Sequence, residues 1–143
     1  MTGPGKHRGQ VFGATLAAAA AVAAGLGYWA FADQPDLAHG KELYAECTGC
    51  HAPQEVLVGP PHCKLFGRPA GSIVDYPYSD AMKHSAIVWN AKHLDGFLRA
   101  PLEYVRGTNM GYAGLANPDD RRDLIGYLKE TTGQAAFCAQ AAG

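Results

Sequence analysis

The sequence lacks an excess of positive charge, and this absence limits its partners. The 143 residues contain 12 lysines and arginines and 13 aspartates and glutamates, a formal net charge of −1. Lys6 and Arg8 precede a long apolar run, and without them 10 basic residues face 13 acidic ones, a formal charge of −3. Nucleic-acid-binding domains carry a basic balance. We therefore exclude nucleic acid as a partner of this chain.

The chain also lacks β-rich runs, internal repeats and low-complexity segments beyond residue 32. Helical patterns are present instead, with Asp36, Ser79 and Asn117 as predicted N-caps and Gly133 as the final stop. The predicted helices cover residues 36–46, 79–85, 90–99 and 118–132, the third closed by Pro101. Residues 52–80 and 102–116 are predicted loops. We expect an all-α domain whose short helices and long loops need an additional group to fill the core.

The N-terminal region lacks charge over 22 consecutive residues, from Val11 to Ala32. A basic start, this apolar run and the small residues before Asp33 are typical of an export signal. A run of this length also suits a retained membrane anchor, with Tyr28 and Trp29 at the interface. We expect residues 1–32 to be a signal peptide or anchor. Residues 33–143 are then the functional domain, exported to the periplasm and either free or anchored at the inner membrane.

The stretch "ECTGCHAP" contains a cysteine pair, Cys47 and Cys50, directly followed by His51. A thioredoxin-like site needs a βαβ pattern beside it, and a zinc site needs four ligands at a characteristic spacing. No β-rich run and no second close cysteine pair exists in the sequence, although Cys63, Cys138 or other histidines could be recruited. Cys-x-x-Cys-His is also the attachment motif of haem c. We favour haem, because a porphyrin would fill the core.

Further stretches of the chain follow one family pattern in order and spacing. They are "GKELYAECTGCH", "GP" at 59–60, "LFGRPAGS", "YPYSDAMKHSAIVW", "HLDGFLRAP", "RGTNMGYAG" and "DRRDLIGYL". On these stretches the chain resembles the class I cytochrome c family, including the mitochondrial type, over nearly all of residues 37–133. The resemblance implies a class I cytochrome c fold, wrapped around one covalent haem c. Cys47 and Cys50 would form the thioethers, and His51 would be one axial ligand.

The second axial ligand is predicted on a downstream loop. The glycine-flanked stretch "GTNMGYAG" lets the backbone approach a flat group, and the resemblance gives its methionine, Met110, the ligand role. Met82 is expected in the core of a short helix. The other candidates are His39, His62, His84 and His93.

Further roles follow from the resemblance by position. Pro60 would accept a hydrogen bond from the His51 ring, which orients the imidazole. Arg68, Tyr78 and Trp89 would contact the haem propionates. Gly40, Tyr44, Leu124 and Tyr127 resemble the family's contact between first and last helices.

The sequence departs from the family pattern at three positions. Arg106 replaces a proline in the Met110 loop, and Phe97 replaces a tyrosine whose hydroxyl approaches the methionine sulfur. His62 replaces an apolar haem contact, and either core packing or partial exposure fits it.

We predict an electron carrier rather than an enzyme, acting between respiratory or photosynthetic donor and acceptor complexes that dock at the haem edge. The alternatives are a membrane-tethered subunit of a larger oxidase or dehydrogenase, and a small haem peroxidase. The membrane is a partner only if residues 11–32 are retained. The expected docking face has no strong basic patch. Its residues are Glu46, Leu102, Glu103, Asn109, Ala116 and Asn117.

Two thiols, Cys63 and Cys138, remain after haem attachment. An exported domain lies in an oxidising compartment, and an even number of remaining thiols favours pairing. We therefore predict a Cys63–Cys138 disulfide. The alternative is two separate thiols, one of them buried.

Overall fold

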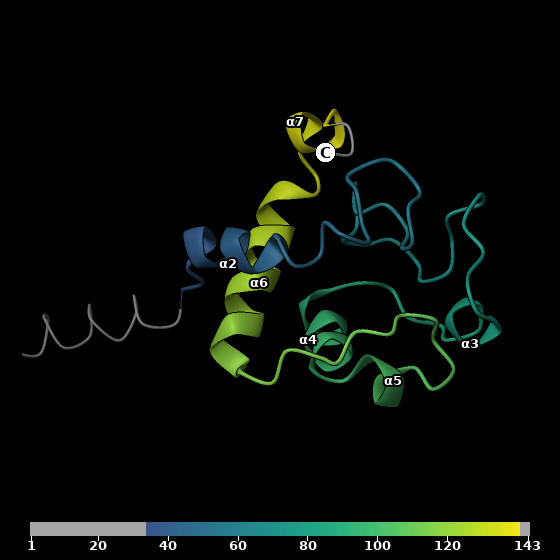
Figure 1. Cartoon of the computed structure of the whole chain (residues 1–143). Coiled ribbons are helices and arrows are strands. Elements are labelled where there is room, and N and C mark those ends of the chain that lie inside the picture. Colours follow the sequence, from purple (N-terminus) through teal and green to yellow (C-terminus); the bar gives the residue numbers. More distant parts are fainter. Residues whose placement is uncertain (1–33, 141–143) are drawn as a thin grey trace, which may run out of the picture. The chain divides into compact units, whose positions relative to one another are not determined.

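The computed structural model describes residues 34–140, and the predicted signal peptide or anchor lies outside them. Within this range there is no strand, only an isolated bridge between Pro69 and Val88, so the all-α prediction is confirmed. The described residues include no helix long and apolar enough to cross a membrane. The helices are α2 (Leu37–Tyr44), α3 (Asp80–Lys83), α4 (Ala91–Arg99), α5 (Pro101–Tyr104), α6 (Pro118–Thr131) and α7 (Ala135–Cys138) (Figure 1).

Local capping explains where the predicted helices begin. Asp36 accepts hydrogen bonds from the backbone N–H groups of Ala38 and His39, and Ser79, Asn90 and Asn117 cap α3, α4 and α6 in the same way. Each cap satisfies a helix N–H that has no intrahelical partner. The four predicted helices are therefore present, with ends that differ by at most two residues from prediction.

Two helices were not predicted. Pro101 begins α5 rather than only closing the preceding helix, so the predicted loop at 102–116 is wrong in its first part. Proline suits the first helical turn because its missing N–H would have no partner there. The segment after Gly133, for which no helix was predicted, contains α7, whose Phe137 is buried with 4% exposure. Single turns such as these have too few residues for a periodic pattern.

Among the described helices the most extensive contact is between α2 and α6, which cross each other in Figure 1. Gly40 makes this contact possible. A Cβ atom at this position would lie 2.2 Å from the backbone oxygen of Asp123 and 2.9 Å from the Tyr127 Cβ. Tyr44, one turn along α2, packs its ring 5.4 Å from that of Tyr127. The predicted first–last helix contact is therefore present and depends on a residue without a side chain.

A polar cluster holds the start of α2 against α6. The Asp123 carboxylate is buried and accepts hydrogen bonds from the Asp36 backbone N–H, from the His39 ring at 3.0 Å and from Arg122. The hydrogen bond to Asp123 raises the pKa of His39 above its ordinary value. Burial alone would raise the pKa of Asp123, but the hydrogen bonds from His39, Asp36 and Arg122 hold it below the ordinary value.

This cluster makes stability depend on pH. The contribution of His39 is complete below its unfolded pKa of about 6.5 and is lost as pH rises through the raised folded pKa. We expect the Tm to fall as the pH rises from about 6 into the alkaline range, and His39→Gln to reduce that fall. Thermal unfolding across this range measures it. His84→Gln is the control, because its exposed ring bonds only a backbone carbonyl in the structure. Equal slopes in His39→Gln and the parent would contradict the assignment.

The structure joins Cys63, in the loop after the haem motif, to Cys138 in α7. Their Cα atoms are 5.1 Å apart, within the ordinary range for a disulfide, and 75 positions separate them in sequence. The Lys64 backbone N–H also donates to the Thr132 carbonyl at 2.7 Å. The disulfide attaches α7, and the hydrogen bond attaches the end of α6, to the loop after the haem motif.

We predict that the oxidised protein contains this bond. Mass spectrometry of unreduced, alkylated protein should give one cross-linked peptide containing Cys63 and Cys138. Closing such a loop reduces the entropy of the unfolded chain, so Cys63→Ser/Cys138→Ser should lower the free energy of unfolding by up to about 4 kcal/mol. Alkylation of both cysteines without reduction would contradict the pairing.

Candidate functional site

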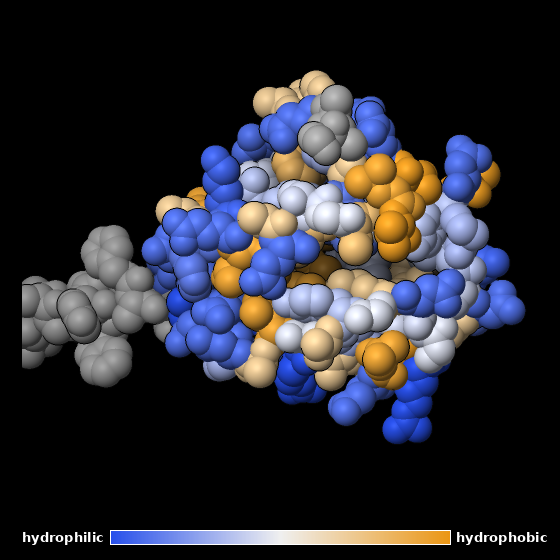
Figure 2. Space-filling view, viewed as in Figure 1, coloured by the Kyte–Doolittle hydropathy of each residue, from blue (hydrophilic) through white to orange (hydrophobic). Residues whose placement is uncertain are grey.

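The described residues surround a cavity of about 480 Å³, a size ordinary for cofactor sites, which span about 300–1,000 Å³. Figure 2 shows the surface hollowed near its centre, with apolar residues inside the hollow. Core residues such as Leu65, Phe97 and Leu124 line it. Every predicted cofactor and metal residue lines this cavity. They are Cys47, Cys50, His51, Pro60, Arg68, Tyr78, Trp89 and Met110.

The cysteine pair lies in turns that continue directly from α2. The Cys47 N–H donates to Tyr44, and the Cys47 carbonyl accepts from both Cys50 and His51 at 3.1 and 2.9 Å. These turns bring both thiols and the imidazole to the same cavity. Burial raises the pKa of Cys47 to about 11, and Glu46 and Cys50 add to the effect. Such a thiol is protonated at neutral pH, which disfavours thiol exchange because the thiolate is the reactive form.

His51 is held in one tautomer and in a confined place. Its Nδ1 lies 2.8 Å from the Pro60 carbonyl oxygen, which can only accept, so Nδ1 carries the proton and donates. The Nε2 lone pair is therefore free to bind a metal. A Cβ atom at Gly59 would lie 2.2 Å from the ring Cε1, so any side chain at this position would displace the His51 ring. Burial lowers the pKa of His51, which also favours the neutral imidazole that a metal requires.

Met110 reaches the cavity from a loop shaped by two glycines with positive φ. Gly107 has φ +93°, and Gly114 has φ +102° and lies so close to the Arg99 carbonyl that a Cβ atom would be only 2.3 Å away. The Met110 backbone N–H donates to the Thr108 side chain at 3.3 Å. Met110 and His51 are thus presented to one cavity by segments far apart in sequence. Met82 is buried in α3, as expected, and also lines the cavity.

Arg121 is not among the residues predicted from the sequence. Its side chain anchors the end of the Met110 loop. It is 6% exposed, donates to the carbonyls of Leu115 and Ala116 and pairs with Asp95 of α4 at 2.7 Å. A positive charge near the N-terminus of a helix is unfavourable because it opposes the helix dipole. The position of Arg121 in the first part of the helix was therefore a signal in the sequence that its side chain has a specific partner. Arg121 therefore joins the end of the loop that carries Met110 to α4 and α6.

Arg68, Tyr78 and Trp89 all line the cavity, and backbone hydrogen bonds join the segments of Arg68 and Trp89. The Arg68 guanidinium donates to the carbonyls of Cys63 and Pro61 at 2.9 and 2.8 Å. It thereby also braces the loop on the His51 side. Burial raises the pKa of Tyr78, so its hydroxyl stays protonated and can donate. The predicted propionate contacts remain predictions.

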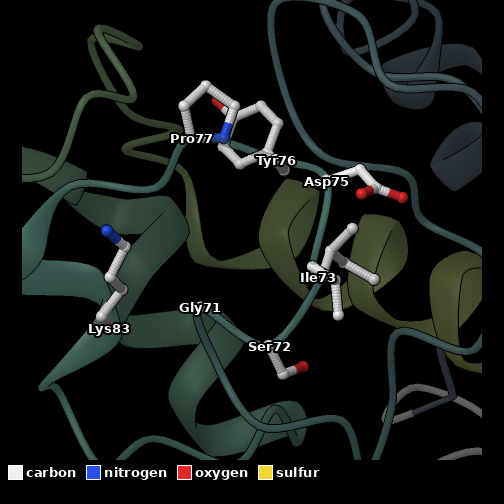
Figure 3. A pocket seen from close by; sticks show the side chains of 8 residues that line it. Gly71, Ser72, Ile73, Asp75, Tyr76, Pro77 and Lys83 are labelled. Carbon is white, nitrogen blue, oxygen red and sulfur yellow. The ribbon is translucent and has the colours of Figure 1, made fainter.

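A zinc site and a second depression both find less support as the functional site. Residues 34–140 hold no group of three or more histidine, cysteine or acidic side chains placed for a metal ion, and Cys63 pairs with Cys138 rather than completing a zinc site. A second depression of about 560 Å³ is lined by residues 71–77 and Lys83 (Figure 3). None of the predicted haem-binding side chains lines it. The central cavity is therefore the candidate site.

The geometry defines a small all-α protein whose core cavity presents two thiols, an imidazole and a thioether. A family model described as Cytochrome c matches residues 37–132. Cytochrome c of Theileria annulata is 46% identical over 101 residues, covering 68% of this chain and 87% of the relative. Cytochrome c2 of Afifella marina is 42% identical over 99 residues, covering 65% and 80%. The solved structure of cytochrome cH from Methylobacterium extorquens aligns with a TM-score of 0.64 at 36% identity, covering 66% of this chain and 98% of that one.

The chain belongs to the cytochrome c family and has the class I fold. Membership implies an electron-transfer role and a covalently bound haem c. The residues that line the cavity fit a haem c, because the cavity is apolar inside and two thiols lie beside an imidazole with a free Nε2. The resemblance noted from the sequence is thus confirmed.

Proposed function

We propose that this chain is a periplasmic electron carrier that binds one haem c, attached through Cys47 and Cys50, with His51 and Met110 as axial ligands. The observation that carries the proposal is the single cavity lined by all four side chains. One Cys-x-x-Cys-His motif supports one haem. When bound, the haem iron supplies the reversible one-electron chemistry, and a His/Met ligand pair raises its potential.

The chain's own residues would hold and tune the group. Pro60 fixes the His51 tautomer, and Thr108 and Arg121 hold the Met110 loop. Phe97 packs its ring 5.1 Å from Trp89 and carries no hydroxyl for the methionine sulfur. If His51 and Met110 both bind the iron, no ligand position would remain for a substrate. This favours a carrier over the alternative of a small haem peroxidase.

We propose that donor and acceptor proteins dock where the cavity reaches the surface, and that basic side chains do not dominate this contact. The expected docking residues are all exposed, and two of them, Glu46 and Glu103, are acidic. Periplasmic export rests on the sequence of residues 1–32. A tethered subunit of a larger complex is the alternative if that segment is retained.

The visible spectrum together with the N-terminal mass of the native protein tests the proposal. We expect one haem per chain, a low-spin six-coordinate spectrum with a methionine–iron band, and a chain that begins near Asp33. A high-spin spectrum would support the peroxidase. An intact N-terminus in membrane fractions would support the tethered subunit.

Met110→Ala should retain covalent haem but lose the methionine–iron absorption band, because a methyl group cannot replace the thioether ligand. The absorption spectrum of the ferric protein measures this. Met82→Ala is the matched control, since Met82 lines the same cavity from α3. A band that survives in Met110→Ala and disappears in Met82→Ala would reverse the assignment.

Cys47→Ser/Cys50→Ser should abolish covalent haem attachment, because serine forms no thioether with a vinyl group. Haem staining of denatured protein and its intact mass measure this. Cys63→Ser/Cys138→Ser serves as the control and should keep its haem. Unchanged covalent haem in the Cys47/Cys50 variant would refute the haem assignment outright.

A further inference from the structure

A second imidazole lies flat against the proposed iron ligand. The ring centroids of His51 and His62 are 4.2 Å apart, with 19° between the ring planes, so the rings are stacked. His62 also lines the cavity and is partly exposed. The hydrogen bond from His51 to Pro60 lies at the edge of the ring. An edge contact restrains the tilt of a ring less than a partner on its face, so His62 supplies a restraint that Pro60 lacks.

His62 is in turn held from the side of α2. The Tyr44 hydroxyl and the His62 Nδ1 are hydrogen-bonded at 3.1 Å. Tyr44 is 6% exposed, and its ring packs 5.4 Å from Tyr127 of α6 and 6.1 Å from Phe137 of α7. The hydroxyl therefore extends from a buried junction where α2, α6 and α7 pack together. The hydrogen bond from this hydroxyl fixes the orientation of the His62 ring. An apolar residue at position 62 could pack against His51 but could not make this bond.

We infer that Tyr44 and His62 form a positioning pair that fixes the plane of the His51 imidazole. The pair transmits the packing of α2 against α6 and α7 to the proposed axial ligand, through one hydrogen bond and one ring stack. Neighbours of a ligating histidine set its orientation and its electron donation to the metal. This inference rests on the proposed function, since His51 must bind the iron for its ring plane to matter.

The test compares the ferric holoprotein with three variants. Tyr44→Phe removes only the hydroxyl and keeps the packed ring, and His62→Leu removes the stacked imidazole. Tyr127→Phe is the matched control, because it removes a hydroxyl from the ring that packs on Tyr44. Proton NMR of the haem methyl groups and electron paramagnetic resonance both report the orientation of an axial imidazole. The midpoint potential and the Tm are measured on the same samples.

We expect Tyr44→Phe and His62→Leu to shift the haem methyl resonances and the g-values, whereas Tyr127→Phe should reproduce the parent spectra. A changed Tm in Tyr44→Phe with parental spectra and potential would overturn the positioning role and leave a structural one. Should His62→Leu fail to fold, Tyr44→Phe alone decides. A parent protein that carries no covalent haem would overturn the proposed function and this inference together, whereas haem-bound variants with parental spectra overturn this inference alone.

Discussion

The close approach of α2 to α6 at Gly40 is the contact on which the rest of the structure depends. Any side chain there would meet the Asp123 backbone, so the helices could not cross at this distance. The crossing buries the Asp123 carboxylate, which then binds Asp36 and His39 at the start of α2. It also places the end of α2 at the cavity, and the turns that follow present the cysteine pair and His51 there.

The two halves of the site are held by different means. The His51 side is braced by backbone carbonyls, through Pro60 on the ring and through Arg68, whose guanidinium donates to Pro61 and Cys63. The Met110 side depends on glycines with positive φ and on buried Arg121, which fastens the loop end to Asp95 of α4. Loops of this length cannot bury enough apolar surface by packing alone. Polar contacts of this kind hold the loops in place around a core that is itself a binding site.

Much of the fold was predictable because its signals are local. Asp36, Ser79 and Asn117 mark helix starts through their own side chains, and the pattern of Leu124, Ile125 and Leu128 marks the buried face of α6. Helix α5 and helix α7 were missed because single turns have no periodicity to detect. Arg121 was missed because its partners are carbonyls in the preceding loop and a carboxylate 26 positions away.

The sequence by itself determined the haem-attachment motif, the family, the helix caps and the identity of the candidate ligands, because each depends on residue types at short, fixed spacings. Only the tertiary structure decided that Cys47, His51 and Met110 line one cavity, that Nδ1 of His51 is the protonated nitrogen, and that His62 stacks on this ring while bonded to Tyr44. These facts depend on distances between segments far apart in the chain. Such distances are fixed by how closely the helices and loops pack. The spacing of residues along the chain does not give these distances.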